Sequence, residues 1–411
     1  MLDYKYVIIG GGLAAGRACD GIRKVDVEGT VALVTDEPHP PYQRPPLSKG
    51  YLVGKDGLDK VYLAGRKHYA ENGIDVLTGV RATKVDADEH RVILGDGRVL
   101  AYGKLLLATG GQAKRLRIPG GNLARVFTLR RIEDAQAIRD AAKSGKRAMV
   151  LGGSFIGSEV AASLTRLGIE VTMVFPESRL LARVVPGELS ALLHKKYEGH
   201  GIQIMPGIKP ISLGGDEMVE WVELDNGQTV PVDLVVMGVG IALNTTLAQD
   251  AELDVDNEGA VMVNSSLQTS NPHIYAAGDI AAWPSFTFGK RLHVEHWDVA
   301  RGQGLRAGRN MAGEDKEYTA IPYFFSDLFD FGFEVWGDLT IWNQTVLRGT
   351  LESGSFAVFY FSQAKIVGVL AVDRPDEERK PMQALIRARV LYEGLAARLQ
   401  EEAVDLGEVI G

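Results

Sequence analysis

Short apolar runs alternate with amphipathic helical stretches through about the first 310 residues of the chain. This alternation is typical of a mostly parallel sheet whose strands are joined by crossover helices. The strands that we expect here span about residues 4–9, 30–35, 105–110, 148–151, 170–174, 233–240 and 274–279. The strand at 233–240 leads back toward the first part of the chain, which predicts that one α/β domain is inserted into another.

The pattern changes near Pro322. Aromatic-rich runs at 356–361 and 366–372 predict a small antiparallel sheet, and residues 375–404 have a charge-rich helical pattern. That last stretch is either a solvated surface helix or a contact face for a partner or a second copy in a homodimer. The fold class that we predict is therefore α/β, with two Rossmann-like dinucleotide-binding domains, one inserted in the other, and a small α+β C-terminal domain. The boundaries expected are 1–112 with 240–314, then 113–239, then 315–411.

Two glycine-rich motifs follow predicted strands and open predicted helices. The first is Gly10-Gly-Gly12-Leu-Ala14-Ala15-Gly16, and the second is Gly152-Gly-Ser154-Phe155-Ile156-Gly157. Glycine lets the backbone turn tightly and come close to a pyrophosphate, which the helix N-terminus then faces. Ser154 replaces the middle glycine of the second motif and narrows that approach. Two such motifs suggest two bound dinucleotides, and the usual reason to hold two is to move a hydride between them.

Composition narrows the choice of chemistry. The net charge of −8 argues against general nucleic-acid binding. We find no apolar run of the roughly 18 residues that a membrane span needs and no signal-peptide pattern, so a cytoplasmic location is expected. Cys19 is the only cysteine and is expected to be a buried apolar residue, so the chain has no dithiol relay. The spacing of His293 and His296 lacks carboxylate or cysteine company, and no metal site is expected.

A carboxylate after the second strand of each nucleotide unit would hold an adenosine ribose. Asp36 and Glu37 occupy that place in the first unit, and Glu37 is preferred. In the second unit the corresponding position is Phe175, and Glu177 follows two residues later. An acid there repels a 2′-phosphate, so NADH is favoured over NADPH, although Arg179 and Arg183 are near enough to reverse the preference.

The loop Pro41-Tyr-Gln-Arg44-Pro-Pro-Leu-Ser-Lys49-Gly-Tyr-Leu52 resembles the flavin loop of FAD-dependent NAD(P)H:ferredoxin reductases. These belong, with apoptosis-inducing factor-like proteins and monodehydroascorbate reductases, to the pyridine nucleotide-disulfide oxidoreductase superfamily. The sequences around Glu159, Asp279, Arg301 and Asp327 also resemble this family. The resemblance covers the chain to about residue 372. It implies FAD and NADH as cofactors.

The resemblance also implies roles for individual residues. Lys49 would lie beside the flavin N5 edge and pair with Glu159, while Arg44 and Arg130 would contact the flavin or its phosphates. Asp279 would accept a hydrogen bond from the ribityl or phosphate region. A helix from His296 to about Met311 would point its positive end at the flavin pyrimidine, beside Trp297. The remaining residues expected at the cofactors are Ala82, Ala108, Thr109, Gly110, Gly240, Gly278, Glu295 and Phe325.

The electron acceptor is left open among three alternatives. A [2Fe–2S] ferredoxin would take single electrons and dock on a basic patch. The candidates for that patch are Arg301, Arg306, Arg309, Lys380, Arg387 and Arg389. A small-molecule acceptor, monodehydroascorbate or a quinone, is the second; Arg301 matches that family's ascorbate-binding arginine, but Phe325 lacks its tyrosine hydroxyl. The third is a redox-sensing flavoprotein like apoptosis-inducing factor.

Overall fold

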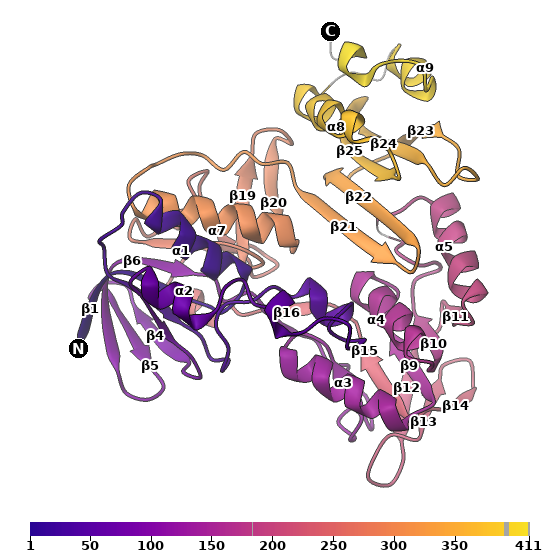
Figure 1. Ribbon diagram of the computed structural model, residues 1–411, viewed down its shortest axis with the longest axis horizontal. Coiled ribbons are helices and arrows are strands. Elements are labelled where there is room, and N and C mark those ends of the chain that lie inside the picture. Colours follow the sequence, from indigo (N-terminus) through magenta and orange to yellow (C-terminus); the bar gives the residue numbers. More distant parts are fainter. Residues whose placement is uncertain (183, 390–393, 410–411) are drawn as a thin grey trace. The chain divides into compact units, whose positions relative to one another are not determined.

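The computed structural model describes residues 1–182, 184–389 and 394–409. Residue contacts divide the chain into two compact units. The first unit comprises Met1–Gln43, Val61–Gln112 and Leu243–Phe324, and the second comprises Arg44–Lys60, Ala113–Ala242 and Phe325–Gly411. Each unit therefore collects segments that lie far apart in the sequence (Figure 1).

The first unit is built on a sheet in the order β3-β2-β1-β6-β5-β4, with β18 also paired to β6. The strands β1, β2, β3, β6 and β18 pair in parallel, and β4 and β5 extend β6 with antiparallel pairs. The main elements of this unit are β1 (Leu2–Ile9), α1 (Leu13–Arg23), β2 (Val31–Val34), α2 (Arg66–Glu71), β3 (Ile74–Leu77), β4 (Ala82–Asp86), β5 (Arg91–Leu94), β6 (Val99–Leu107), α6 (Thr246–Asp250), β18 (Ile274–Ala276) and α7 (Trp297–Met311). A smaller sheet contains β17 (Val261–Met262), β19 (Ala281–Ser285) and β20 (Lys290–His293).

Helices α1 and α7 pack side by side because small residues line their contact (Figure 1). A Cβ added at Gly304 would come within 2.2 Å of the carbonyl oxygen of Ala14, and one at Gly308 within 2.1 Å of that of Ala18. Only hydrogen fits at these positions. The close packing fixes α7 against the helix that opens the first glycine motif.

The second unit contains a five-stranded parallel sheet in the order β11-β10-β9-β15-β8. Its elements are η1 (Pro45–Ser48), η2 (Leu58–Lys60), β8 (Val126–Thr128), α3 (Ile132–Ser144), β9 (Arg147–Leu151), α4 (Phe155–Arg166), β10 (Glu170–Phe175), α5 (Gly187–Gly199), β11 (Gln203–Pro206) and β15 (Leu234–Met237). An antiparallel sheet of β12 (Pro210–Gly214), β13 (Trp221–Leu224) and β14 (Thr229–Pro231) packs its apolar face on the same core. The strands β7 (Gly111–Ala113) and β16 (Ile241–Leu243) pair where the chain passes between the units.

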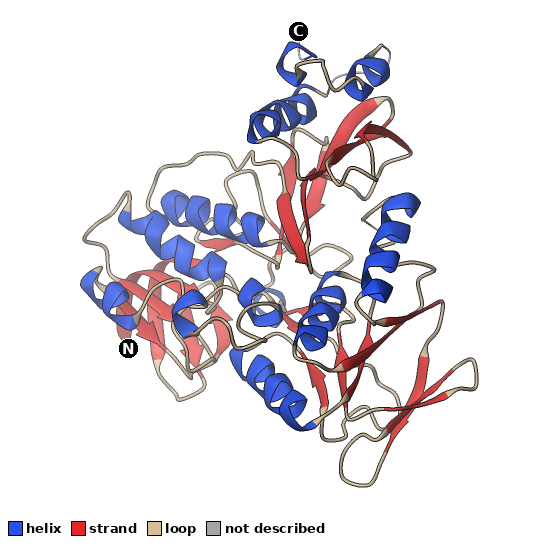
Figure 2. Ribbon diagram, turned by 45° about the vertical axis from the view of Figure 1, so that its right-hand side comes forward, coloured by secondary structure: helices blue, strands red, loops and turns tan. Residues whose placement is uncertain are grey.

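The C-terminal part of the second unit is a five-stranded sheet in the order β21-β22-β25-β24-β23. Its strands are β21 (Tyr323–Leu328), β22 (Phe331–Gly337), β23 (Gln344–Gly349), β24 (Phe356–Ser362) and β25 (Lys365–Val372). The chain ends in α8 (Asp376–Ala388), α9 (Leu395–Gln400) and η3 (Leu406–Val409), gathered near one end of the red strands of this sheet in Figure 2.

The α/β fold class with an added C-terminal domain is confirmed. Some element bounds differ from the expectation. The strand expected over 233–240 is β15 alone, because Gly240 has φ +94 and turns the chain before β16. The helical stretch expected over 375–404 forms two separate helices, because Arg389 adopts φ +49 and ends α8. Met382, Leu385 and Ile386 of α8 are buried, so this helix is solvated on one face only.

Candidate functional site

The first glycine motif forms a cradle at the end of β1. Gly10 has φ +139, and a Cβ there would meet the carbonyl oxygen of Ala108 at 2.1 Å. Gly12 is the N-cap of α1 and makes no side-chain cap, and no heavy atom of the described residues lies within 4 Å of a Cβ built on it. Among the described residues, no side chain caps the first-turn N–H groups of α1, at Leu13, Ala14 and Ala15. This donor set fits the pyrophosphate of a dinucleotide such as FAD.

A buried carboxylate lies beyond this cradle. Glu37 is buried and accepts a hydrogen bond of 2.5 Å from the hydroxyl of Tyr42. Asp36 instead forms an ion pair of 3.0 Å with the exposed Arg81. Glu37 as the ribose acid remains a proposal. Tyr42 lies in the Pro41–Leu52 loop but was not predicted as a site residue.

The turns at Ala108–Gly110 and at Gly278 lie against the first cradle, next to Gly10 and Ala14 respectively. Thr109 donates to the carbonyl of Asn244 at 2.6 Å, and the Asn244 side chain returns a hydrogen bond of 3.1 Å, which fixes the turn at Ala108–Gly110. Gly278, with φ +81, donates its N–H to the side chain of Gln303 on α7 at 2.9 Å. Neither Asn244 nor Gln303 was predicted.

Ala82 and Asp279 occupy different surroundings near these turns. Ala82 is buried at the start of β4, where it pairs with Leu94. Asp279 directly follows Gly278, and its backbone carbonyl contacts His293 at 2.6 Å. Both remain proposals as cofactor contacts.

The N-terminus of α7 carries an unsatisfied imidazole. His296 is the N-cap residue, and its buried Nδ1 has no hydrogen-bond partner among the described residues. Burial lowers the pKa of His296 from 6.5 to about 4, and its ring lies 4.5 Å from that of Phe324. Trp297 is half-buried and donates its indole N–H to Gln43 at 3.0 Å, whereas Glu295 is exposed. An orphaned buried nitrogen at a helix N-terminus fits a polar cofactor group placed there.

The second glycine motif forms an equivalent cradle between β9 and α4. A Cβ at Gly152, which has φ +125, would lie 2.2 Å from the carbonyl oxygen of Gly238, and one at Gly157 would lie 2.1 Å from that of Gly152. Ser154 is the N-cap of α4, is exposed, and makes no side-chain cap. Ile156 is exposed and Phe155 is half-buried. The serine side chain therefore does not cap the first-turn amides of α4.

At the end of β10, Phe175 belongs to the core, whereas Glu177 is the candidate for binding the ribose. Phe175 is fully buried, and its ring would lie 2.7 Å from a Cβ at Gly153, so this aromatic ring requires the glycine. Glu177 is half-buried. Arg179 donates to the backbone carbonyls of Ala182 and Val185 at 3.0 and 2.5 Å, so its guanidinium holds its own loop. Arg183 lies outside the described residues.

Lys49 and Glu159 meet, as expected, although they are far apart in sequence. Lys49 Nζ lies 3.3 Å from Glu159 Oε1, and the two side chains are only 19% and 9% exposed. This is a largely buried pair rather than a surface one. The hydroxyls of Ser48 and Ser326 donate to the two Glu159 oxygens at 2.5 and 3.1 Å.

A second group of contacts surrounds the Lys49 ammonium. It lies 3.4 Å from Asp327 Oδ2 and 5.0 Å from the centre of the Phe325 ring. Ser48, Ser326 and Asp327 were not predicted as site residues. They could have been predicted, because they lie in the Pro41–Leu52 loop and in the stretch around Asp327, which both resemble the reductase family.

Arg44 and Arg130 are also linked. Arg44 Nη1 donates to the backbone carbonyl of Arg130. The backbone N–H groups of Arg130 and Arg131 donate to Asp134 at 2.8 and 2.9 Å, which caps α3. The loop that carries Lys49 is thus held to the start of α3.

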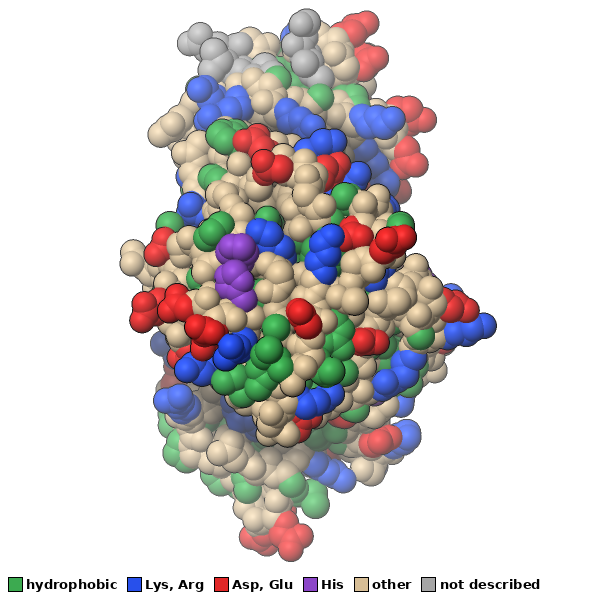
Figure 3. All heavy atoms as spheres, turned by 90° about the vertical axis from the view of Figure 1, so that its left-hand side faces the viewer, with side chains coloured by type: hydrophobic (Ala, Val, Ile, Leu, Met, Phe, Trp, Pro, Cys, Tyr) green, Lys and Arg blue, Asp and Glu red, His purple; other side chains and the backbone are tan. Residues whose placement is uncertain are grey.

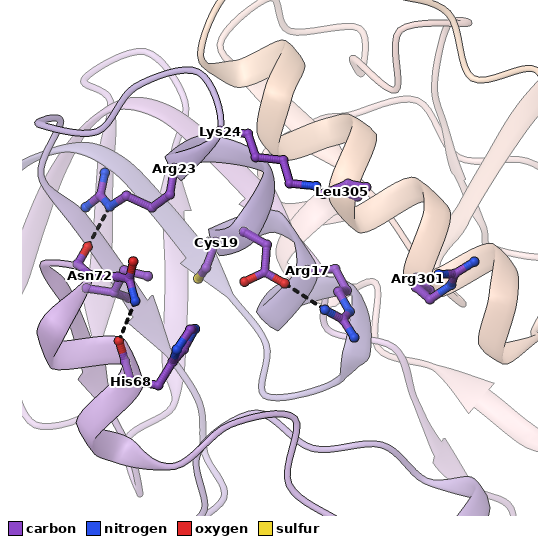
Figure 4. Close-up of a pocket in the computed structure, with 10 residues that line it drawn as sticks. Arg17, Cys19, Arg23, Lys24, His68, Asn72, Arg301 and Leu305 are labelled. Atoms are coloured by element: carbon purple, nitrogen blue, oxygen red, sulfur yellow. Dashed lines mark hydrogen bonds and ion pairs between the residues drawn. The ribbon is translucent and has the colours of Figure 1, made fainter.

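A basic groove lies on the first unit, over α1. It encloses about 480 Å³ and is lined by Arg17, Cys19, Asp20, Arg23, Lys24, His68, Asn72, Ile74, Arg301 and Leu305 (Figure 4). Arg17 pairs with Asp20 and Arg301 with Asp298, whereas Lys24 forms no ion pair with a described residue. The face of the protein in Figure 3 mixes acidic and basic side chains.

Two of the other arginines predicted for a basic patch share a single carboxylate, which Lys316 also contacts at 3.1 Å, while Arg387 and Arg389 stay candidates. Arg306 and Arg309 both bind Glu314, at 3.0 and 2.7 Å. Cys19 is fully buried, and burial raises the pKa of its thiol, so the expectation of an unreactive apolar cysteine is confirmed. Within the described ranges, no helix is long and apolar enough to cross a membrane.

Comparisons with known proteins agree on one family. Residues 4–304 match the model of the pyridine nucleotide-disulphide oxidoreductases, and residues 323–410 match the reductase C-terminal model. The chain is 34% identical to the 5,5'-dehydrodivanillate O-demethylase ferredoxin reductase subunit of a Sphingobium species, covering 91% of each chain. It is 33% identical to monodehydroascorbate reductase 3 of Arabidopsis thaliana, over 98% of this chain and 97% of that one. The crystal structure of a covalent putidaredoxin reductase–putidaredoxin complex matches with a TM-score of 0.93 at 33% identity, covering 100% of this chain and 99% of the other.

Proposed function

Because this chain belongs to the pyridine nucleotide-disulphide oxidoreductase family, we propose that it is an FAD-dependent NADH oxidoreductase that delivers electrons to a [2Fe–2S] ferredoxin. The observation that carries this proposal is the pair of uncapped helix N-termini at α1 and α4, each behind a glycine turn that excludes side chains. Because Cys19 is the only cysteine and is buried, the electrons have no thiol relay inside the chain. They must pass to an external acceptor.

The bound cofactors would supply the redox chemistry, since FAD accepts a hydride from NADH and gives up electrons one at a time. The Lys49–Glu159 pair supports this chemistry electrostatically. A fixed ammonium stabilises negative charge that arrives nearby, and the carboxylate offsets the free energy needed to bury the ammonium. Neither group needs to move a proton, because the hydride is transferred directly. At α7, the helix N-terminus and the unpartnered His296 nitrogen would face polar flavin atoms.

Glu177 supports NADH as the electron donor. An acid at the ribose position repels a 2′-phosphate, and the Arg179 guanidinium is already engaged by two backbone carbonyls. We expect kcat/KM for NADH to exceed that for NADPH by about tenfold or more. Measurement of initial rates with both nucleotides tests this, and a preference for NADPH would overturn the placement of Glu177.

Two observations, the names of similar proteins and the local charge, favour a ferredoxin as the acceptor. A relative named as a ferredoxin reductase subunit and a reductase–putidaredoxin complex both align over at least nine-tenths of this chain. Ferredoxins of this kind are acidic, and the basic groove over α1 offers local positive charge on an otherwise acidic chain. The similarity to a monodehydroascorbate reductase keeps a small-molecule acceptor as the second candidate. Phe325, which contacts Lys49, argues against this second candidate, because it lacks the tyrosine hydroxyl of the monodehydroascorbate reductases.

Stopped-flow reoxidation of the NADH-reduced protein tests the acceptor. The panel is ferredoxin, monodehydroascorbate, a quinone, ferricyanide and oxygen, and we expect ferredoxin to discharge the flavin fastest. Fast discharge by ferricyanide and quinone alone would refute the ferredoxin assignment. A long-lived reduced complex with every acceptor would favour a redox-sensing role instead, and protein that fails to take up FAD would overturn the whole proposal.

We also infer a cytoplasmic location, because the reaction draws on the NADH pool of that compartment. Fractionation of cells that make the protein tests this inference. Recovery in a membrane or secreted fraction would be the contrary result.

A further inference from the structure

The hairpin of β21 and β22 is attached to the helices of the nucleotide-binding part of the second unit. Its two-residue turn places Phe329 at φ +57, a conformation that a non-glycine residue holds only when its surroundings enforce it. The Phe329 ring stacks on His200 with centroids 3.8 Å apart, and Arg166 lies 5.6 Å from its centre. Arg166 also donates to the Phe329 carbonyl at 2.9 Å.

The next residue completes the attachment. Asp330 accepts hydrogen bonds from Lys196 on α5 through both carboxylate oxygens, each at 3.0 Å. We call Phe329 and Asp330 the hairpin anchor. The anchor ties β21 to the C-terminal ends of α4 and α5, and α4 is the helix that the second glycine motif opens.

The strand so anchored contacts the Lys49–Glu159 pair through three consecutive residues. Ser326 is fully buried and donates to Glu159, while the neighbouring Phe325 and Asp327 are exposed and contact Lys49. Hydrogen bonds to both oxygens of a carboxylate fix its orientation. The C-terminal domain therefore supplies one of the two hydroxyls that hold the pair.

We propose that Ser326 is a positioning residue, which fixes the Glu159 carboxylate and through it the Lys49 ammonium, and that the hairpin anchor keeps Ser326 in place. This inference rests on the proposed function, because it assumes that the Lys49–Glu159 pair serves flavin reduction. It gives the C-terminal domain a part in that step, separate from any contact with the acceptor. Ser48 holds the other carboxylate oxygen, so loss of Ser326 weakens the hold without abolishing it.

The experiment compares FAD-loaded Ser326→Ala with Ser326→Thr, which retains a hydroxyl, and with Ser362→Ala at the end of β24 as a control in the same sheet. Stopped-flow reduction by NADH gives the limiting rate and the Kd for NADH, and a spectroscopic titration gives the flavin midpoint potential. We expect Ser326→Ala to lower the limiting rate about tenfold with Kd within about twofold, and to shift the potential in the direction that Lys49→Ala shifts it. Ser326→Thr should restore most of the rate, and Ser362→Ala should match the wild type.

A further variant tests the anchor. Phe329→Gly removes the ring but suits the left-handed turn, so it should fold and reproduce the Ser326→Ala result. If Lys49→Ala and Glu159→Gln slow reduction while Ser326→Ala leaves rate and potential unchanged, this inference is overturned and the proposed function stands. If Lys49→Ala and Glu159→Gln change neither quantity, the role of the pair and this inference both fail. If the wild type is not reduced by NADH at all, the proposed function itself fails.

Discussion

At the scale of single residues, steric collision explains why some positions of the two motifs are glycine. Gly10 and Gly12 lie two positions apart but have different reasons for being glycine. At Gly10 an added Cβ would strike the Ala108 carbonyl, whereas at Gly12 the space is open in the protein. The first glycine is required by the fold, whereas we expect the second to be required by the ligand.

This contrast gives a matched pair of variants. Gly10→Ala should destabilise the protein by about 3 kcal/mol, because it combines backbone strain with overpacking. Gly12→Ala should change the stability of the FAD-free protein by less than about 0.5 kcal/mol and yet prevent FAD retention. Thermal unfolding and the ratio of flavin to protein absorbance separate the two effects. Normal FAD content in Gly12→Ala would show that the pyrophosphate does not lie there.

His296 gives a pH dependence whose direction follows from its burial. The unfolded imidazole takes up a proton near pH 6.5, but the folded one resists protonation until about pH 4. The unfolded state therefore binds more protons in this window, and stability falls as pH drops through it, by up to about 3 kcal/mol. In FAD-free protein, the wild-type Tm should fall more steeply from pH 6.5 to pH 4 than that of His296→Gln. Parallel curves would contradict the buried neutral histidine.

At the scale of elements, one buried arginine fastens the end of the chain to the C-terminal sheet. Arg348 on β23 is 2% exposed and binds the Glu378 carboxylate of α8 at 3.0 Å. It also donates to the backbone carbonyls of Leu399, Glu401, Glu402 and Val404. Arg348 thus holds the segment that follows α9, together with Arg374, which pairs with Glu402, and Arg398, which donates to the Glu408 carbonyl.

Replacement of Arg348 should release the segment. Arg348→Met leaves four carbonyls without their donor and should cost about 3–5 kcal/mol, with faster proteolysis beyond α8. Arg379, which pairs with Glu334 but is 43% exposed, is the control, and Arg379→Met should cost less than about 1 kcal/mol. Thermal unfolding and mass spectrometry of the proteolytic fragments measure both. Equal losses for the two variants would refute a special role for Arg348.

At the scale of the whole molecule, attraction of an acidic partner has to work against the net charge of −8. Long-range attraction is therefore weak, and we expect docking to depend on local cations such as Lys24, the groove lysine that forms no ion pair with the part of the chain described. Screening by salt acts over about 8–10 Å, which is the scale of such a groove.

A charge reversal tests this docking surface. Lys24→Glu should lower kcat/KM for ferredoxin about tenfold at low salt, and less at high salt. Lys84→Glu on β4 makes the same change of net charge at another exposed site and is the control. Turnover with a neutral quinone should be the same in all three proteins. An equal loss in both variants would mean that only net charge matters.

The sequence alone was sufficient for the features that depend on local chain geometry. The strands that precede Gly10 and Gly152, the helices that follow, and the buried Cys19 were predicted from patterning and confirmed. The partnership of Lys49 with Glu159 came from resemblance, since no local pattern joins residues so distant in the chain.

Tertiary structure alone decided which residues complete the sites. Ser326, Gln303, Asn244 and Tyr42 are ordinary polar residues in sequence, and each gains its role from a partner on another element. The end of α8 at Arg389 could not be predicted either, because the left-handed conformation of Arg389 does not interrupt the pattern of charged residues in the sequence. Periodicity and glycine spacing report on neighbours along the chain. Hydrogen bonds of buried groups are settled only when the folded chain brings their partners within about 3 Å.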